Sequence, residues 1–177
     1  MFEPNSVYAK IAYDTILLYV KTNHKLEKRE SEIPDALKLK LGCNVSIYDS
    51  DEKLRARYGT PYPKQNYLFH EIIENAIIAA KGGSNAEPLA EKELNNISIH
   101  VDVFSKPKQI ENQQYLKPHK HGIIIESEKG DPVMIFPNQD GIENPEQMIT
   151  KARKKAGVED KDENEINIQY FTTTTYK

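Results

Sequence analysis

The stretch LRARYGTPYPKQNYLFHEIIENAIIAA, residues 54–80, is the most informative part of this sequence for the fold. Residues 54–58 alternate in polarity and predict a strand, and Gly59 is expected to permit a turn because it lacks a Cβ atom. The two prolines that follow stiffen the chain, since proline fixes its φ angle and donates no hydrogen bond. Residues 65–81 carry one broad apolar stripe at helical spacing. The region therefore predicts a strand, a turn and an amphipathic helix in close succession.

The sequence on both sides predicts further helices and strands. Helices are expected at 7–21, 88–94 and 144–157, and strands at 43–49, 97–104, 121–127, 132–137 and 166–176. Residues 105–120 are polar and predict a long connection, and a turn is expected at 128–131. Many connections are too short for repeated parallel crossovers, so we expect an α+β fold with a mixed, mainly antiparallel sheet and flanking helices. The length of 177 residues predicts one domain, 1–177, or two interlocked halves.

The segment NPEQMITKARKKAG, residues 144–157, carries start and stop signals of a helix. Asn144 is a good N-cap, proline suits the first helical position, and Gln147 three residues on completes a capping-box pattern. Three basic residues lie in the last turn, where the helix dipole favours cations, and Gly157 is expected to end the helix.

Composition narrows the classes of protein. The net charge is −3 and the pI is near 6.0, whereas nucleic-acid binders usually carry a basic balance or a basic face. No apolar run approaches the roughly 20 residues of a membrane span, and the N-terminal MFEPNSVYAK does not resemble a secretory signal. A single cysteine cannot form an internal disulfide, so a reducing cytoplasm is the expected location.

Three groups of residues are candidates for chemistry. His119 and His121 share a face if they lie on a strand, but metal sites usually need three or four ligands, and no metal site is expected. Cys43 starts an apolar strand, where a free cysteine is commonly a small buried hydrophobe. The basic run KARKK, residues 151–155, fits a solvated helix end better than a phosphate site. The sequence also lacks a glycine-rich phosphate loop, so we expect neither a catalytic set nor a cofactor.

The ordered pieces resemble the AMMECR family, named for the human Alport-syndrome, midface-hypoplasia and elliptocytosis chromosomal region. LRARYG, residues 54–59, takes the place of the family's Leu-Arg-Gly-Cys-Ile-Gly motif between a strand and a helix. The other matching pieces are ELNNISIHVDVFSKPKQIE at 93–111, HGIIIE at 121–126, IFP at 135–137 and EQMITKARKKAGV at 146–158. Arg57 occupies the family's cysteine position and Ala56 that of the preceding glycine, which marks a divergent member of prokaryotic type.

The resemblance implies an α+β fold with a barrel-like mixed sheet built from two similar halves. It also implies an accessory or binding role, because prokaryotic relatives often occur alongside Memo-like proteins and radical-SAM enzymes, which are the partners to expect. A guanidinium at position 57 cannot replace a thiolate as a nucleophile or soft metal ligand, although it can hold an anion or a carboxylate.

Three functional hypotheses follow. The first is a binding or accessory module without catalysis, and it is favoured because no acid, base, nucleophile or metal set is assembled in the sequence. Its cleft is expected to be lined by Arg55, Arg57, Tyr58, Gly59, Tyr62, His121, Gly122 and Pro137. The second is a small enzyme that uses His121 as general base and Arg57 as anion clamp. The third is a nucleic-acid binder that uses the KARKK helix and the loop at 117–120.

Overall fold

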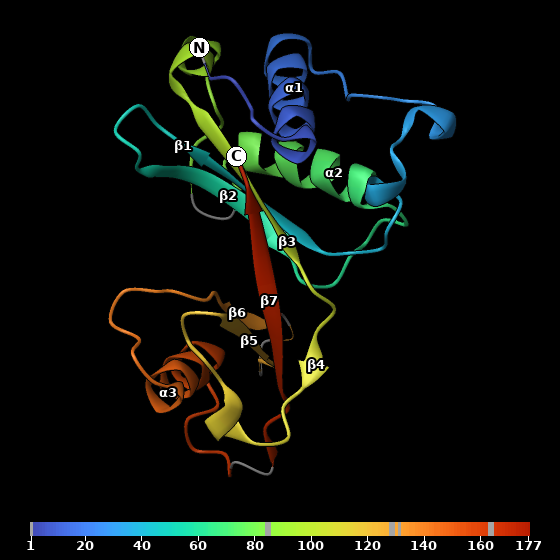
Figure 1. Ribbon diagram of the computed structural model, residues 1–177. Coiled ribbons are helices and arrows are strands. Elements are labelled where there is room, and N and C mark those ends of the chain that lie inside the picture. The colour runs from blue at the N-terminus through green and yellow to red at the C-terminus, as the bar shows by residue number, and fades with distance from the viewer. Residues whose placement is uncertain (1, 84–85, 128–129, 131, 163–164) are drawn as a thin grey trace. The chain divides into compact units, whose positions relative to one another are not determined.

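The structure, a computed structural model, describes residues 2–83, 86–127, 130, 132–162 and 165–177. It divides into two compact units (Figure 1). Unit 1 comprises Met1–Val103 and Thr174–Lys177, and unit 2 comprises Phe104–Thr173. Each unit combines helices with strands, and the strand pairs described below are antiparallel. The prediction of an α+β fold with a mainly antiparallel sheet is therefore confirmed.

Unit 1 places two helices against three neighbouring strands in the order β2-β1-β3. Its elements are α1 (Val7–Thr22), β1 (Cys43–Tyr48), β2 (Leu54–Thr60), α2 (Leu68–Ala80) and β3 (Ser98–Phe104). Short 3-10 turns lie at Glu30–Glu32, Asp35–Leu37 and Glu91–Asn96, so the helix predicted at 88–94 is a 3-10 turn. Among the described residues, no helix of either unit combines the length and the apolarity needed to cross a membrane.

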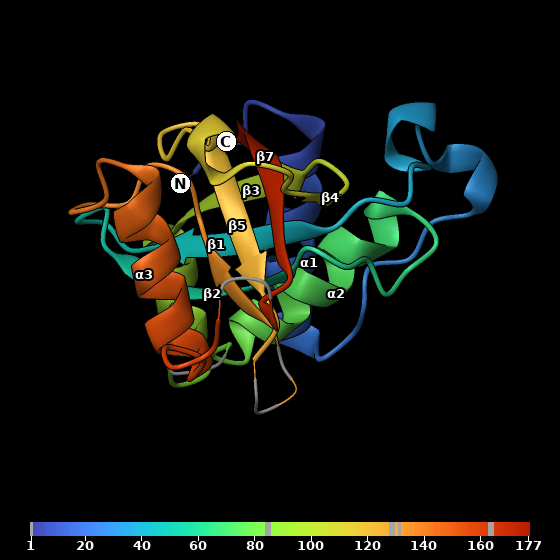
Figure 2. The same ribbon diagram turned by 90° about the horizontal axis from the view of Figure 1, so that it is seen from below.

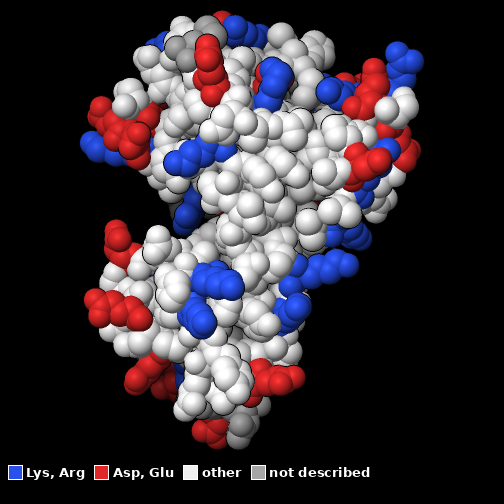
Figure 3. All heavy atoms as spheres, viewed as in Figure 1, with Lys and Arg blue, Asp and Glu red and all other residues white. Residues whose placement is uncertain are grey.

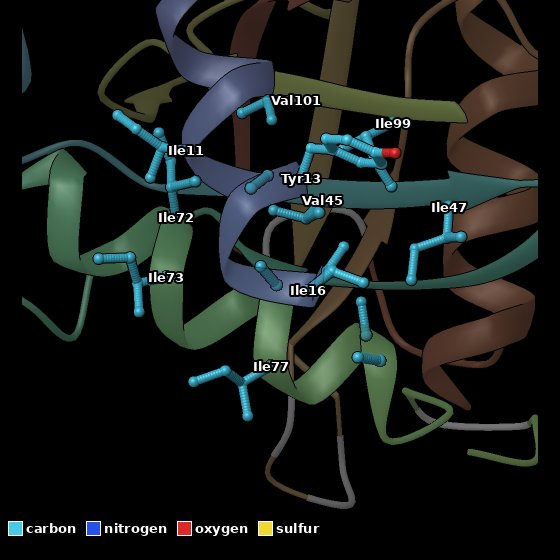
Figure 4. Packing of buried hydrophobic residues seen from close by; sticks show 14 of the residues in the cluster. Ile11, Tyr13, Ile16, Val45, Ile47, Ile72, Ile73, Ile77, Ile99 and Val101 are labelled. Atoms are coloured by element: carbon cyan, nitrogen blue, oxygen red, sulfur yellow. The ribbon is translucent and has the colours of Figure 1, made fainter. Parts of the chain in front are cut away.

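The core of unit 1 lies between its helices and one face of its strands (Figure 4). Alternate residues of β1 and β3 point to this face, as the period of two in a strand requires. Val45, Ile47, Ile99 and Val101 are fully buried there. The other face of the same strands carries polar side chains.

The turn predicted at Gly59 is wrong, because Gly59 lies inside β2 and pairs with Asn44 of β1. A Cβ atom at position 59 would come within 2.4 Å of both the Asn44 Cα and the Cys43 carbonyl oxygen. Glycine is required here because the two backbones approach closely. Close approach of another backbone is a common reason for a glycine inside a strand.

Unit 2 contains three neighbouring strands in the order β6-β5-β7. A further strand, β4, pairs with β7 outside this order. Its elements are β4 (Lys108–Gln109), a 3-10 turn (Gln113–Tyr115), β5 (His121–Ile125), β6 (Val133–Ile135), α3 (Pro145–Ala156) and β7 (Ile168–Tyr176), whose last residues belong to unit 1. The predicted connection at 105–120 thus contains β4 and a helical turn. The turn predicted at 128–131 lies outside the described residues except for Gly130.

Helix α3 packs against β5 and β6 and closes the core of unit 2 (Figure 2). Its predicted caps are present: the Asn144 side chain accepts from the Gln147 N–H at 2.9 Å, and Gly157 adopts a left-handed φ of 72°. The capping box differs in one detail. The Gln147 side chain accepts from the N–H of Glu143, one residue before the N-cap, at 2.8 Å.

Candidate functional site

The strands of unit 1 carry two rows of polar residues on the face away from the helices. The first row runs from Arg57 on β2 to Ser46 on β1 and His100 on β3, each paired in register with the next. In the second row, Asn44 pairs with Gly59 on one side and Asp102 on the other. We call Asn44, Ser46, Arg57, His100 and Asp102 the polar face.

Hydrogen bonds connect three residues of the polar face, Asn44, Ser46 and Asp102, into a network. The Asn44 side-chain amide donates to the Ser46 hydroxyl at 2.8 Å and to the Asp102 carboxylate at 3.3 Å. The Thr175 hydroxyl, from the end of β7, donates to the other Asp102 oxygen at 2.6 Å. Asn44 and Ser46 are each only 3% exposed. Because buried polar groups that lose their partners are costly, this network holds its side chains in place before any ligand arrives.

Arg57 is the exposed member of the polar face. A guanidinium presents a rigid fork of donors that matches carboxylate and phosphate oxygens. The polar face therefore combines an exposed guanidinium with hydrogen-bonded polar side chains on the neighbouring strands.

Arg55, two residues earlier on β2, has a structural role. Its Nε donates to Glu93 Oε1 at 2.7 Å and its Nη2 to Glu93 Oε2 at 3.3 Å, with both side chains less than a third exposed. Its Nη1 also donates to the carbonyl of Glu87 at 3.1 Å. The hydrogen bond from Arg55 lowers the pKa of Glu93, which keeps the carboxylate charged. Arg55 thus fastens the segment before β3 to strand β2.

The segment between β2 and α2 is held by a buried carboxylate. Glu71, in the first turn of α2, is 1% exposed and accepts from the N–H of Lys64 at 2.9 Å and of Gln65 at 2.8 Å. These bonds fix the proline-containing exit of the LRARYG strand. Tyr62 in this segment is 42% exposed, and its N–H donates to the Thr60 hydroxyl at 3.2 Å.

The remaining residues predicted to line the cleft have separate surroundings. Tyr58 pairs with Val45 and packs against the core of unit 1, on the face opposite Arg57. His121, Gly122 and Pro137 belong to unit 2. Gly122 lies under the ring of Phe171, where a Cβ atom would come within 2.3 Å. The structure thus brings Arg57 and Gly59 together on the polar face and describes His121 in a pocket of unit 2.

The only cysteine lies on the core side of β1. Cys43 is fully buried, and burial raises the pKa of its thiol to about 12 even though the Asn75 amide donates to the sulfur at 3.3 Å. A thiol of this kind is inert as a nucleophile at neutral pH. The interpretation of Cys43 as a small buried hydrophobe agrees with this placement.

The two histidines nearest the candidate sites favour their neutral forms. Burial, together with the charge of Lys177, lowers the pKa of His100 on the polar face. The centroids of the His100 and Tyr48 rings lie 4.6 Å apart. Burial and the charge of Lys120 lower the pKa of His121. Among the described residues, no three His, Cys, Asp or Glu side chains are placed to hold a metal ion together.

One residue of the basic run on α3, Arg153, stabilises the loop that follows the helix. The Arg153 guanidinium donates to the carbonyls of Glu159 at 2.8 Å and of Lys161, which closes the loop that follows the helix. Lysine and arginine side chains are interspersed with acidic ones in the view of Figure 3.

Comparisons with known proteins identify the family to which the chain belongs. The sequence profile of the AMMECR1 family matches residues 9–176, and the chain belongs to this family. A Thermotoga maritima protein is 31% identical over 172 residues, covering 96% of this chain and 97% of that protein. A Clostridium acetobutylicum protein is 28% identical over 173 residues, and this chain spans only 36% of its length.

A solved structure shows the same fold. The uncharacterized protein PH0010 from Pyrococcus horikoshii has a TM-score of 0.81 at 23% identity, covering 95% of this chain and 88% of that one. The resemblance read from the ordered sequence pieces is therefore confirmed, and so is the fold expected from it.

Sequence reasoning missed most of the polar face. The signal was present in CNVSIYD and ISIHVDVF, where polar residues alternate with apolar ones. The alternation predicts that His100 and Asp102 share a face, but it gives no register between strands. The register alone shows that Ser46 lies between Arg57 and His100.

Proposed function

We propose that this chain is a binding module without catalysis of its own, and that the polar face of unit 1 receives an anionic group of its ligand or partner. The observation that carries the proposal is the register of Arg57 with Ser46 and His100, next to the row that contains the buried Asn44 and its hydrogen bonds. A preorganised surface of this kind binds without first having to order its side chains.

The chemistry at position 57 supports binding over nucleophilic catalysis. In the family pattern this position is a cysteine, and here it is an arginine on the exposed side of β2. The one thiol of the chain, Cys43, points into the core and has a raised pKa. An arginine stays charged and cannot transfer its proton at neutral pH, so its natural role is to hold an anion.

An NMR titration tests the proposal with two simple probes, inorganic phosphate and acetate. We expect amide shifts to concentrate on β1, β2 and β3 around Arg57, with an affinity that falls at least about tenfold in Arg57→Ala because a charge-assisted hydrogen bond is lost. Arg29→Ala is the matched control, since its side chain is 88% exposed in the same unit. Thermal unfolding of each variant first confirms that it is folded. Equal titrations of wild type and Arg57→Ala would refute the assignment of the polar face.

The same variants test the partners that the family association suggests. We propose that a Memo-like protein or a radical-SAM enzyme from the same organism presents a carboxylate or phosphate to Arg57. Purified candidates are titrated against wild type, Arg57→Ala and Arg29→Ala by calorimetry. Loss of binding with Arg57→Ala alone supports the proposal, and retained binding means that the partner uses another surface.

A further inference from the structure

Unit 2 contains a pocket of about 580 Å³ that lies entirely within its own residues. This volume falls in the range of small-molecule sites. The residues that line it include Lys108, Ile110, Tyr115, Leu116, His121 and Tyr170. They come from β4, the 3-10 turn that follows it, β5 and β7.

Strand register explains why these residues meet. Tyr170 on β7 pairs with Lys108 on one side and with Ile123, a residue of the unit 2 core, on the other. Ile110 and Tyr170 are partly buried against this core, and Leu116 is 4% exposed within it. The pocket therefore has an apolar base that continues the core, with a tyrosine ring as part of that base.

His121 lines the pocket and carries an N–H donor on its ring. Its Nδ1 accepts a hydrogen bond from the N–H of Lys117 at 3.2 Å, so the ring proton lies on Nε2. The ring packs against Tyr170 with centroids 5.2 Å apart and a tilt of 49°. Burial, with the charges of Lys120, Lys117 and His119, lowers the pKa of His121, so the imidazole stays a neutral donor at pH 7.

The charges near the pocket favour an anion. Lys108 lines the pocket, and the positive charges of Lys117 and Lys120 help to lower the pKa of His121. Glu111 is the acidic residue among the lining side chains. A basic surrounding with a neutral N–H donor suits a carboxylate or a phosphate better than a cation.

Tyr115 completes the site from the solvent side. It lines the pocket while 74% of its surface is exposed, which is unusual for a large aromatic side chain. A flat ring bound in the pocket would cover this tyrosine and contact Tyr170 as well. Aromatic pairs of this kind contribute beyond the area they bury.

We propose that the unit 2 pocket binds a small ligand in which an aromatic ring carries one anionic group. The ring contacts Tyr115 and Tyr170 over the apolar base formed by Ile110 and Leu116. The anionic group accepts from the His121 Nε2–H and lies near Lys108. All residues of this site belong to unit 2, whereas the residues of the polar face belong to unit 1.

The test titrates the full chain with 2-naphthoate and 2-naphthyl phosphate, and follows amide shifts by NMR. Two control probes separate the parts of the ligand: 2-naphthalenemethanol keeps the ring without charge, and acetate keeps the charge without a ring. We expect at least one aromatic anion to bind with a Kd below about 1 mM, with shifts on β4, β5 and β7, and both control probes to bind at least about tenfold more weakly. Failure of both aromatic anions, or equal binding of 2-naphthalenemethanol, overturns the proposal.

Variants then assign the contacts. Tyr115→Ala removes an exposed ring, and His121→Asn keeps an oxygen to accept from Lys117 while it removes the Nε2–H donor. Each is expected to weaken binding of the aromatic anion at least about tenfold. Lys155→Ala, an exposed lysine on α3, is the control for charge, and Arg57→Ala shows that the polar face is not involved. Unchanged binding in Tyr115→Ala and His121→Asn, with both variants folded, overturns the assignment.

Discussion

Gly59 offers a direct test of how the LRARYG strand is held, and the perturbation is Gly59→Ala. The new Cβ would lie 2.4 Å from the Asn44 Cα and 2.4 Å from the Cys43 carbonyl oxygen. Carbon contacts in proteins normally lie near 3.5–4.0 Å, so β1 and β2 would have to separate by roughly 1 Å at this point. The obstacles are backbone atoms of a paired strand, and they cannot turn aside as the end of a side chain can.

The expected cost follows from this geometry. Overpacking a core costs about 1–3 kcal/mol, and a strand separation that also stretches ladder hydrogen bonds belongs at the upper end, about 3 kcal/mol. At 2–4 °C per kcal/mol for a chain of this length, we expect the melting temperature to fall by about 6–12 °C.

Urea unfolding followed by far-UV circular dichroism measures the loss, with Gly157→Ala as the comparison. Gly157 has a φ of 72° and open space where its Cβ would be. Gly157→Ala should therefore lower the free energy of unfolding by backbone strain alone, about 1 kcal/mol. The order of the two losses is the critical result. A Gly59→Ala variant within about 0.5 kcal/mol of wild type, or less destabilised than Gly157→Ala, refutes the close-approach explanation.

Three further predictions concern a hydroxyl, a thiol and two imidazoles that folding removes wholly or partly from water. The Tyr13 hydroxyl is buried without a hydrogen-bond partner among the described residues, so Tyr13→Phe should raise the free energy of unfolding by up to about 1 kcal/mol in the same urea assay, and a clear loss would show that the hydroxyl is paired. The Cys43 pKa of about 12 predicts that a disulfide reagent at pH 8 labels the unfolded chain at least about a hundredfold faster than the native one, and equal rates would contradict its burial. Folding lowers the pKa values of His100 and His121, so the unfolded chain binds more protons than the folded one as the pH falls through 6.5. The free energy of unfolding should therefore drop from about pH 7 to about pH 5.5. The drop should be less steep when both histidines are replaced by glutamine.

The features that sequence predicted well are those set by local chemistry. Helix α3, Pro145–Ala156, is capped by Asn144 and Gly157 as the sequence predicts, because capping depends on residues within one turn of each end. Strand β3 was found from the alternation of ISIHVDVF, since a strand with one buried face must alternate. Periodicity and caps are read along the chain, and a single sequence contains them in full.

The features that were missed depend on pairing between distant segments. Gly59 is compatible with a turn or with a close approach, and only its register with Asn44 decides between them. The wall of the unit 2 pocket was read as a polar connection, because two-residue β4 and a single helical turn leave no periodic signal. Its binding features arise where Lys108 meets Tyr170, 62 positions along the chain, in the antiparallel pair.

Position 57 shows how this fold separates the support of a site from its chemistry. The supporting parts are the close approach at Gly59, the hydrogen bonds of Asn44 and the backbone held by Glu71. An exposed residue on such a strand can change type while its neighbours Ser46 and His100 keep their places. A change of residue type at position 57 therefore alters the chemistry that this strand presents, and an arginine presents a guanidinium, which is able to hold an anion. For this reason we expect Arg57→Cys to remain folded and to lose anion binding, which makes the side chain at position 57, and not the fold, the determinant of what the polar face recognises.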